Sequence, residues 1–318
     1  MEKLFSEAGI QGGGDIMAIT FDEVSYAYDD RTLWRSGALE GVNLDIPPGT
    51  FTGIAGTTGS GKSTLLQHFN GILRPTEGRV RILDVVVNAR EKAPKMSELR
   101  RRVGLVFQFP EQQLFEDTVE KDLCFGPLNF GMSLAEARER ARWALDLLGL
   151  DESLLSRNPF HLSGGQMRKV AIASVLAMDP EVIALDEPTA TLDPQSRAEL
   201  AALLSKLHRE QGKTVIVVTH RMEELLPYVD GWIIMKSGRT LFQGTTDALV
   251  RESAVLEQEG LALPECITLW NQLAAQYGME GEKPCLTPDS LAERLEQAFL
   301  AAGRSKDREE RLACGESL

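Results

Sequence analysis

The chain has 318 residues and a formal net charge of -13, from 47 acidic and 34 basic side chains. At roughly 150 residues per domain, this length predicts about two domains. The acidic balance disfavours a nucleic-acid-binding protein, which normally carries a basic face, so we expect no nucleic-acid partner. The sequence has no apolar run of about 18 residues that would span a membrane. Its four cysteines lack the C-x-x-C spacing of a zinc site.

The first part of the chain combines strand patterns with one helix pattern. Residues 1–16 are polar and Gly-rich and lack the apolar core of a signal peptide, so we expect a disordered extension or a start site assigned too far upstream. Strand patterns then follow in chain order at 19–28, 42–46, 51–55 and 79–87, and a helix pattern at 64–73 follows the third of them.

The rest of the chain continues the alternation. A capping box at Ser133–Glu136 predicts the start of a helix that Gly149 ends. The other predicted elements, in chain order, are a strand at 103–107, a helix at 170–177, a strand at 182–185, a helix at 195–210, strands at 215–219, 232–235 and 240–242, and helices beyond 246. Residues 305–318 read as a charged tail. Short apolar strands that alternate with helices predict an α/β fold.

A Gly-rich loop follows the strand at 51–55 and fits the pattern G-x-x-x-x-G-K-[ST]. The predicted nucleotide site comprises this loop and the next residue: Gly56, Thr57, Thr58, Gly59, Ser60, Gly61, Lys62, Ser63 and Thr64. Backbone N–H groups of such a loop cradle phosphates, Lys62 neutralises their charge, and Ser63 offers an oxygen to Mg²⁺. The alternative is a plain Gly-rich turn before a helix. No Asn-Lys-x-Asp motif is present, which disfavours a GTPase.

A second Ser/Gly-rich motif opens the helix near residue 164. It consists of Leu162 followed by Ser163, Gly164, Gly165 and Gln166. A helix that starts in this way also suits a phosphate, although Ser163 as an ordinary N-cap is the alternative. Two acidic residues, Asp186 and Glu187, end the apolar strand at 182–185, and the carboxyl ends of parallel strands are where ligands bind. We expect Asp186 to hold Mg²⁺ and Glu187 to polarise the attacking water.

With these motifs in this order, the chain resembles the ATP-binding-cassette ATPases. The resemblance covers residues 17–245 and implies a P-loop NTPase core with an antiparallel β subdomain and a nested helical subdomain at about 110–178. In this family two chains sandwich two ATP molecules, and the Leu-Ser-Gly-Gly-Gln motif of each faces the phosphate loop of the other. A single copy of each motif therefore implies a dimer.

The resemblance also implies roles for residues outside the two phosphate motifs. Gln108 would contact Mg²⁺ or the lytic water and sense the membrane partner. His220 would bond the γ-phosphate and position Glu187, which makes Glu187, His220 and Gln108 the expected catalytic residues. Asp193 would lie in the loop that contacts the partner subunit and its nucleotide. Tyr28 would stack on adenine, with Tyr26 as the alternative.

Two further segments resemble one branch of the family, the ATPases of energy-coupling-factor transporters. They are Gln108–Phe115 and Phe125–Pro127. This resemblance implies import of vitamins or of cobalt or nickel ions, and it is strongest to the second of two ATPase types that pair as a heterodimer, with a homodimer as the alternative. It also implies a membrane coupling subunit, a substrate-binding membrane subunit, a place on the cytoplasmic face of the membrane, and a helical dimerisation extension over residues 246–304.

The chain departs from this branch at three positions. Thr57 stands where the branch often has His, Lys169 where Arg is usual, and Thr191 where a small residue is usual. Two alternative functions are a cassette protein without a transport role and a nucleotide-binding regulator without hydrolysis, and the presence of Glu187, Gln108 and His220 disfavours the regulator. We expect Phe109, Leu114 and Phe115 to line a docking surface for the membrane subunit; the alternative is that they pack internally.

Overall fold

The computed structural model describes residues 17–28, 37–92, 94–190, 192–279 and 282–297. The predictions for residues 1–16, 305–318 and Thr191 lie outside these residues. The chain divides into two compact units, which are described separately. The first contains residues 1–220 and 228–244, and the second contains residues 221–227 and 245–318.

A six-stranded sheet forms the centre of the first unit, in the order β10-β9-β3-β8-β7-β6. Its strands are β3 (Phe51–Gly56), β6 (Val103–Val106), β7 (Val182–Asp186), β8 (Thr214–Val218), β9 (Gly231–Lys236) and β10 (Arg239–Thr245). From β9 to β6 every pair of neighbours is parallel. Every residue of β6, β7 and β8 is buried, as expected for continuous apolar strands that are covered on both faces. Gly53 of β3 leaves room for the ring of Trp232 on β9, because a Cβ at this position would lie 2.4 Å from that ring.

A four-stranded antiparallel sheet has the order β2-β1-β4-β5. Its strands are β1 (Ile19–Ala27), β2 (Gly37–Ile46), β4 (Glu77–Ile82) and β5 (Val85–Asn88). The prediction of one strand over 79–87 is wrong, because the chain turns back at Leu83 and Asp84 and so forms a hairpin. Leu83 takes a left-handed conformation (φ 52°) without the Gly or Asn that normally signals such a turn. One core cluster joins this sheet to the central sheet, including Phe21, Leu44 and Val80 beside Ile54 and Leu65.

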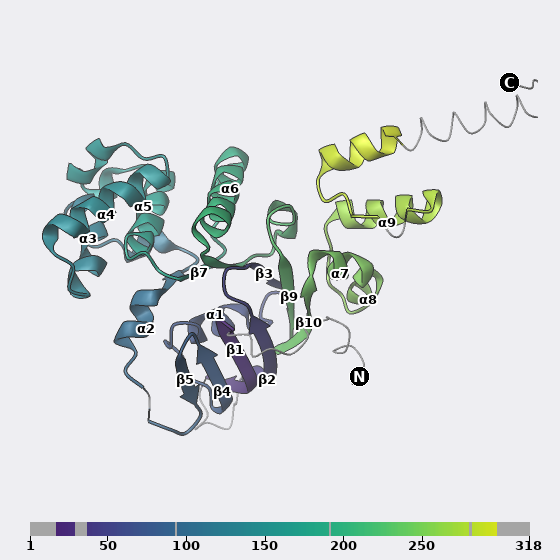
Figure 1. Ribbon diagram of the computed structural model, residues 1–318, viewed down its shortest axis with the longest axis horizontal. Helices are drawn as coiled ribbons and strands as arrows, with labels where there is room; N and C mark the ends of the chain where they lie inside the picture. Colours follow the sequence, from purple (N-terminus) through teal and green to yellow (C-terminus); the bar gives the residue numbers. More distant parts are fainter. Residues whose placement is uncertain (1–16, 29–36, 93, 191, 280–281, 298–318) are drawn as a thin grey trace, which may run out of the picture. The chain divides into compact units, whose positions relative to one another are not determined.

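The helices of the first unit are α1 (Lys62–His68), α2 (Ser97–Arg102), α3 (Val119–Asn129), α4 (Leu134–Leu147), α5 (Gly164–Leu176) and α6 (Pro194–Gln211). α3, α4 and α5 pack together into one helical group (Figure 1). The capping box at Ser133 is confirmed, and a second one at Ser163 starts α5 six residues before the predicted position. The helix predicted at 64–73 ends at His68, so its second half is wrong.

The second unit is helical, as predicted for the chain beyond residue 246. It contains α7 (Thr246–Arg251), α8 (Ser253–Gln258) and α9 (Glu265–Tyr277). α9 buries Ile267, Trp270 and Ala274, which lie three or four residues apart on one helical face. Asn271 of α9 donates hydrogen bonds to the Ser253 hydroxyl at 2.6 Å and to the Val250 carbonyl at 3.3 Å. Across the described part of the chain, no helix is both long and apolar enough to cross a bilayer.

Candidate functional site

The predicted site residues gather at the carboxyl edge of the central sheet. Asp186 is the last residue of β7 and lies opposite Val218, the last residue of β8. His220 follows β8 by two residues, Gln108 follows β6 by two, and β3 runs directly into the Gly-rich loop. Because these four strands are parallel neighbours, segments as far apart in sequence as residues 56 and 220 meet at one edge.

Three glycines of the phosphate loop have backbone conformations that residues with a side chain rarely adopt. Gly56, Gly59 and Gly61 all have positive φ, and a Cβ on Gly56 would lie 2.1 Å from the carbonyl oxygen of Met235. The loop curls around the Lys62 ammonium, which donates to the carbonyls of Gly56 and Thr57 at 2.9 Å each. Partial burial lowers the pKa of Lys62, and the carboxylates of Glu187 and Asp186 oppose that shift. A cation thus faces the two acids across the site.

Asp186 and Ser63 form an oxygen-rich pair beside Lys62. Asp186 is 6% exposed, and burial raises the pKa of its carboxyl, while the Ser63 hydroxyl donates to it and lowers the pKa in return. No cluster of three or more His, Cys, Asp or Glu side chains that would hold a metal occurs in the described residues. One carboxylate with a hydroxyl and phosphate oxygens is instead the donor set with which proteins bind Mg²⁺ beside a nucleotide, so these residues fit that ion.

Glu187 lies next to Asp186 in a strained backbone conformation. Its φ is 49°, and its N–H donates to the carbonyl of Val218 at 2.9 Å. Its carboxylate lies 2.7 Å from Nδ1 of His220, 33 residues later in the chain. The Glu187 side chain is 12% exposed, whereas that of His220 is 56% exposed. The pair therefore offers a sheltered carboxylate held by an imidazole that is open to a ligand.

The two candidate tyrosines differ in their surroundings. The Tyr28 hydroxyl lies 3.0 Å from Oγ1 of Thr64 in α1, so the ring stands beside the phosphate loop, and it is 45% exposed. Tyr26 packs edge-on against both Tyr28 and His68, at centroid distances of 5.0 and 5.2 Å. The Tyr28 ring is thus the more exposed of the two, and its stacking on adenine stays a prediction.

The two remaining motifs begin helices. Ser163 caps α5 by accepting from the Gln166 N–H, and additional side chains on Gly164 or Gly165 would meet only open space. Asp193 caps α6 by accepting from the Ser196 N–H at 3.0 Å, and this serine lowers the pKa of the Asp193 carboxyl. Ser163 thus caps the helix whether or not it also meets a phosphate, and contacts of both motifs with nucleotide across a dimer stay predictions.

The sequence reasoning missed one residue of this region, Arg168 in α5. It is 1% exposed, and its guanidinium contacts the backbone at both Gln108 and Glu187. The available signal was a basic residue among the apolar residues of the helix, since Val170, Ala171 and Ile172 beside it are also buried.

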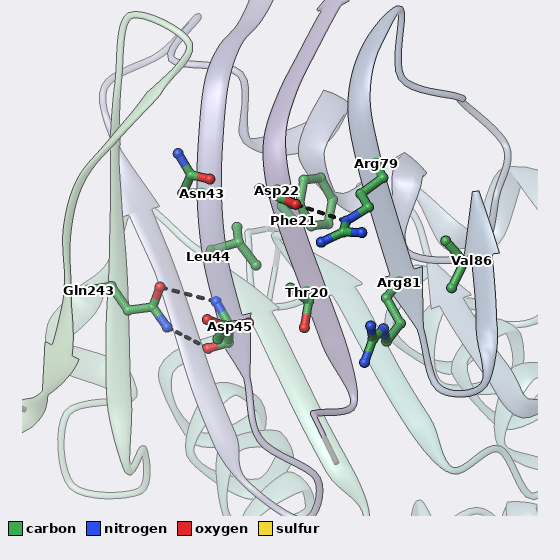
Figure 2. Close-up of a pocket in the computed structure, with 10 residues that line it drawn as sticks. All are labelled: Thr20, Phe21, Asp22, Asn43, Leu44, Asp45, Arg79, Arg81, Val86 and Gln243. Carbon is green, nitrogen blue, oxygen red and sulfur yellow. Dashed lines mark hydrogen bonds and ion pairs between the residues drawn. The ribbon is translucent and has the colours of Figure 1, made fainter. Parts of the chain in front are cut away.

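A pocket of about 380 Å³ lies elsewhere, over the antiparallel sheet and β10 (Figure 2). Arg79 and Asp22 form an ion pair of 2.8 Å in it, and Gln243 exchanges hydrogen bonds with the backbone of Asp45 (Figure 2). None of its lining residues belongs to the predicted nucleotide site.

The fold and these motifs together define an ATP-binding-cassette ATPase. Residues 39–190 match the family described as ABC transporter. Among solved structures, cbiO1 from Clostridium perfringens, described as part of the ABC transporter complex cbiONQ, has a TM-score of 0.66 and 38% identity over 80% of this chain and 98% of its own. MJ0796, a bacterial ABC transporter cassette solved as a dimer, has a TM-score of 0.64 and 34% identity over 72% of this chain and 98% of its own.

Comparison with curated relatives identifies the branch of the family to which the chain belongs. The energy-coupling factor transporter ATP-binding protein EcfA2 of Geobacillus kaustophilus is 47% identical over 283 residues, which cover 89% of this chain and 98% of the relative. EcfA2 of Listeria monocytogenes is 45% identical over 287 residues, which cover 90% and 99%. The chain therefore belongs to the energy-coupling factor transporter ATP-binding proteins, and it is similar to the second ATPase type of that family. The predictions of the family, of its branch and of an ABC-type ATPase are confirmed.

Proposed function

We propose that the chain binds ATP with Mg²⁺ and hydrolyses it as the motor subunit of an energy-coupling-factor importer for vitamins or for cobalt or nickel ions. The observation that carries the proposal is the hydrogen-bonded pair of Glu187 and His220, beside Lys62 and Asp186 at one edge of the sheet. A regulator that only binds nucleotide has no need of this pair, and neither alternative function accounts for the relatives' transporter names.

The phosphate loop would hold the triphosphate of ATP. Its backbone N–H groups and the Lys62 ammonium would balance the phosphate charge, and the exposed ring of Tyr28 would stack on adenine. The hydroxyl contact between Tyr28 and Thr64 supports this arrangement, because it keeps the ring next to α1. The preference for Tyr28 over Tyr26 rests on its greater exposure.

Ser63, Asp186 and Gln108 would hold Mg²⁺, together with oxygens of the β- and γ-phosphates. When bound, the ion would neutralise charge that develops on the transferred phosphoryl group. Asp186 would be ionised in this state, since the ion offsets the burial that raises its pKa in the free protein.

Glu187 would orient the attacking water and accept its proton. The strained backbone and the hydrogen bond to His220 both restrict where this carboxylate lies, which is what a water-positioning group requires. The opposite side of the exposed His220 ring would face the γ-phosphate, and its Nε2 would donate to that phosphate when the imidazole carries a proton on both nitrogens. His220 would thus connect the γ-phosphate to the position of Glu187.

A second ATPase subunit would complete each site. Ser163, Gly164, Gly165 and Gln166 would face the ATP bound to the partner, and the open space around the glycines supports such a close approach. Asp193 would contact the partner's nucleotide site. We propose a heterodimer, because the relatives are named as the second type, and a homodimer is the alternative. Residues 17–245 would form the ATPase domain and residues 246–304 the dimerisation extension.

Integral membrane subunits for coupling and for substrate binding would be the remaining partners, at the cytoplasmic face of the membrane. The support is a set of exposed apolar side chains that we call the aromatic surface: Phe109 and Phe115 in the segment before α3, and Phe125 and Leu128 in α3, with exposures of 44%, 58%, 46% and 42%. The rings of Phe115 and Phe125 meet edge-on at 4.8 Å. Asp122 accepts from the Phe115 N–H at 3.2 Å and so supports its loop. Leu114 is only 5% exposed, so the expectation that it lines this surface is wrong.

Replacing Glu187 by Gln tests the proposal. The variant should bind ATP as tightly as the wild type, while single-turnover hydrolysis by the assembled dimer falls by about 100-fold or more, because the carboxylate that accepts the proton is gone. Glu98→Gln is the matched control, since Glu98 pairs with Arg101 on the exposed helix α2. Hydrolysis at the wild-type rate in Glu187→Gln would refute the role of Glu187. Failure of the purified complex to contain integral membrane proteins would favour the non-transport alternative.

A further inference from the structure

Arg168 is a fully buried arginine whose guanidinium contacts the backbone carbonyls of three described residues at the site edge. Nε donates to the carbonyl of Pro188 at 2.9 Å, and Nη2 donates to the carbonyls of Glu187 at 2.9 Å and Gln108 at 3.0 Å. Nη1 lies 3.9 Å from the Glu111 carboxylate. The residue comes from α5, whereas its partners come from the segments that follow β7 and β6.

The partners are the backbone groups that carry two of the proposed catalytic side chains. Gln108 and Glu187 follow the neighbouring strands β6 and β7, and Arg168 bonds to the backbones of both with the same nitrogen. Glu187 also has a left-handed backbone with φ of 49°, which a non-Gly residue keeps only when its surroundings impose it. Its N–H donates to Val218, and its carbonyl accepts from Arg168 and, at 3.2 Å, from the N–H of Ala190; together these hydrogen bonds supply that constraint.

The chemistry of the side chain suits this task. A guanidinium is planar and presents five N–H donors in a fixed fork, so its contacts with several carbonyls define one relative arrangement of them. A lysine at the same place would present a compact ammonium on a flexible stem, and it would not reach the three carbonyls in the same geometry. The charge is offset by Glu111, whose Oε2 is buried and makes no hydrogen bond to any described residue.

We propose that Arg168 is a positioning residue for ATP hydrolysis, which holds the backbone of Glu187 and the loop at Gln108 in the arrangement that hydrolysis requires. It acts through those residues and does not itself touch the nucleotide. The inference rests on the proposed function, because it takes Glu187 as the group that activates water. A residue with this role affects the rate of the chemical step more than the binding of ATP.

The test compares Arg168→Lys and Arg168→Met in the full-length chain, assembled with the subunits that co-purify with it. Single-turnover hydrolysis at saturating ATP, the Kd for a fluorescent ATP analogue and the melting temperature are measured. Arg168→Lys should hydrolyse about tenfold more slowly or worse, with Kd within about twofold of the wild type, because small misplacements of catalytic groups have effects of this size. Arg168→Met should be slower still. Arg138→Met is the control, since Arg138 makes an exposed ion pair between helices α4 and α3.

If Arg168→Met does not fold, Arg168→Lys decides the matter, because it keeps the charge and nearly the length of the side chain. Hydrolysis by Arg168→Lys within about twofold of the wild type would overturn the inference, as would an equal loss of ATP binding and hydrolysis. Glu187→Gln is measured in parallel. An inactive Glu187→Gln with a fully active Arg168→Lys would refute only the role of Arg168, whereas an active Glu187→Gln would refute the proposed function of Glu187 itself.

Discussion

Phe115 and Leu114 are adjacent in sequence but have opposite surroundings, which allows a sharp test of the docking surface. Phe115 is 58% exposed and Leu114 is 5% exposed. We expect Phe115→Gln to keep the fold and the ATP site while it weakens association with the membrane subunits. Leu114→Gln should instead destabilise the helical group, and both effects follow from how much of each side chain is covered.

The magnitudes can be worked from burial. A Phe side chain that is fully covered buries about 150–250 Å². Since 58% of Phe115 is exposed, about two fifths is covered. At about 25 cal/mol/Å² this corresponds to about 1.5–2.5 kcal/mol, which is an upper bound. Leu114→Gln loses about 2–3 kcal/mol of apolar burial and adds a buried amide that costs about 1–3 kcal/mol more. Against a typical unfolding free energy of about 5–15 kcal/mol, only the second change threatens folding.

The assay uses a tagged full-length chain purified with its partners from solubilised membranes. The amounts of co-purified integral proteins, the Kd for an ATP analogue and the melting temperature are measured for each variant. Phe115→Gln should keep Kd within about twofold and lose about nine tenths of the co-purified membrane protein, because interface residues of this kind carry most of the binding energy. Val86→Gln is the control, since Val86 is 40% exposed on the antiparallel sheet, outside the aromatic surface. Full membrane association in Phe115→Gln would refute the docking surface, and a loss of ATP binding together with folding would show that Phe115 serves packing.

Three further predictions concern the nucleotide site, the dimer and pH. Lys62→Ala should weaken binding of an ATP analogue by about tenfold or more, since a charge next to the phosphates is lost; unchanged affinity would contradict the site. Ser163→Arg should leave the chain's own ATP binding intact but stop hydrolysis at the partner's phosphate loop, measured in a mixed dimer in which Lys62→Ala inactivates this chain's own loop; hydrolysis in that dimer would contradict the composite site. Burial lowers the pKa of His68 from 6.5 to about 4, so as pH falls the unfolded chain binds a proton on this ring before the folded chain does. The neutral ring therefore contributes its full free energy of folding above about pH 6.5, and this contribution is lost as pH falls toward 4. In His68→Leu, the loss of unfolding free energy between about pH 6.5 and 4, measured by urea unfolding, should be smaller than in the wild type by up to about 3 kcal/mol. An equal loss in both proteins would refute this prediction.

The sequence alone determined the family and most of the central strands, and it predicted the residues of the site. The motifs at Lys62, Ser163 and Glu187 are local in sequence, because a phosphate loop, a helix cap and a strand end each involve only a few neighbouring residues. The buried strands β6, β7 and β8 are continuous apolar runs, so their pattern is also local.

Elements whose limits depend on distant partners were predicted less well. The turn at Leu83 carries no Gly or Asn, and the hairpin exists because β4 also pairs with β1, about 60 residues earlier. α1 ends at His68, five residues before its predicted end, although the apolar pattern continues to Leu73. In the first case pairing with a remote strand overrode a local pattern. In the second the apolar pattern hid a local signal, because Gly71 takes a left-handed conformation (φ 67°) just after the helix ends.

Only the tertiary structure decided which side chains meet. The sheet order places the end of β7 between the ends of β6 and β8, and this order brings Glu187 within 2.7 Å of His220. The tertiary structure also makes Arg168, one of two adjacent basic residues in α5, a contact between Gln108 and Glu187. Neighbouring residues such as Leu114 and Phe115 have equal hydrophobic character in sequence, and only the packing of the helical group buries one and exposes the other. Local patterns report the intrinsic preference of a segment, whereas burial and side-chain partners arise from contacts between segments that are remote in the chain.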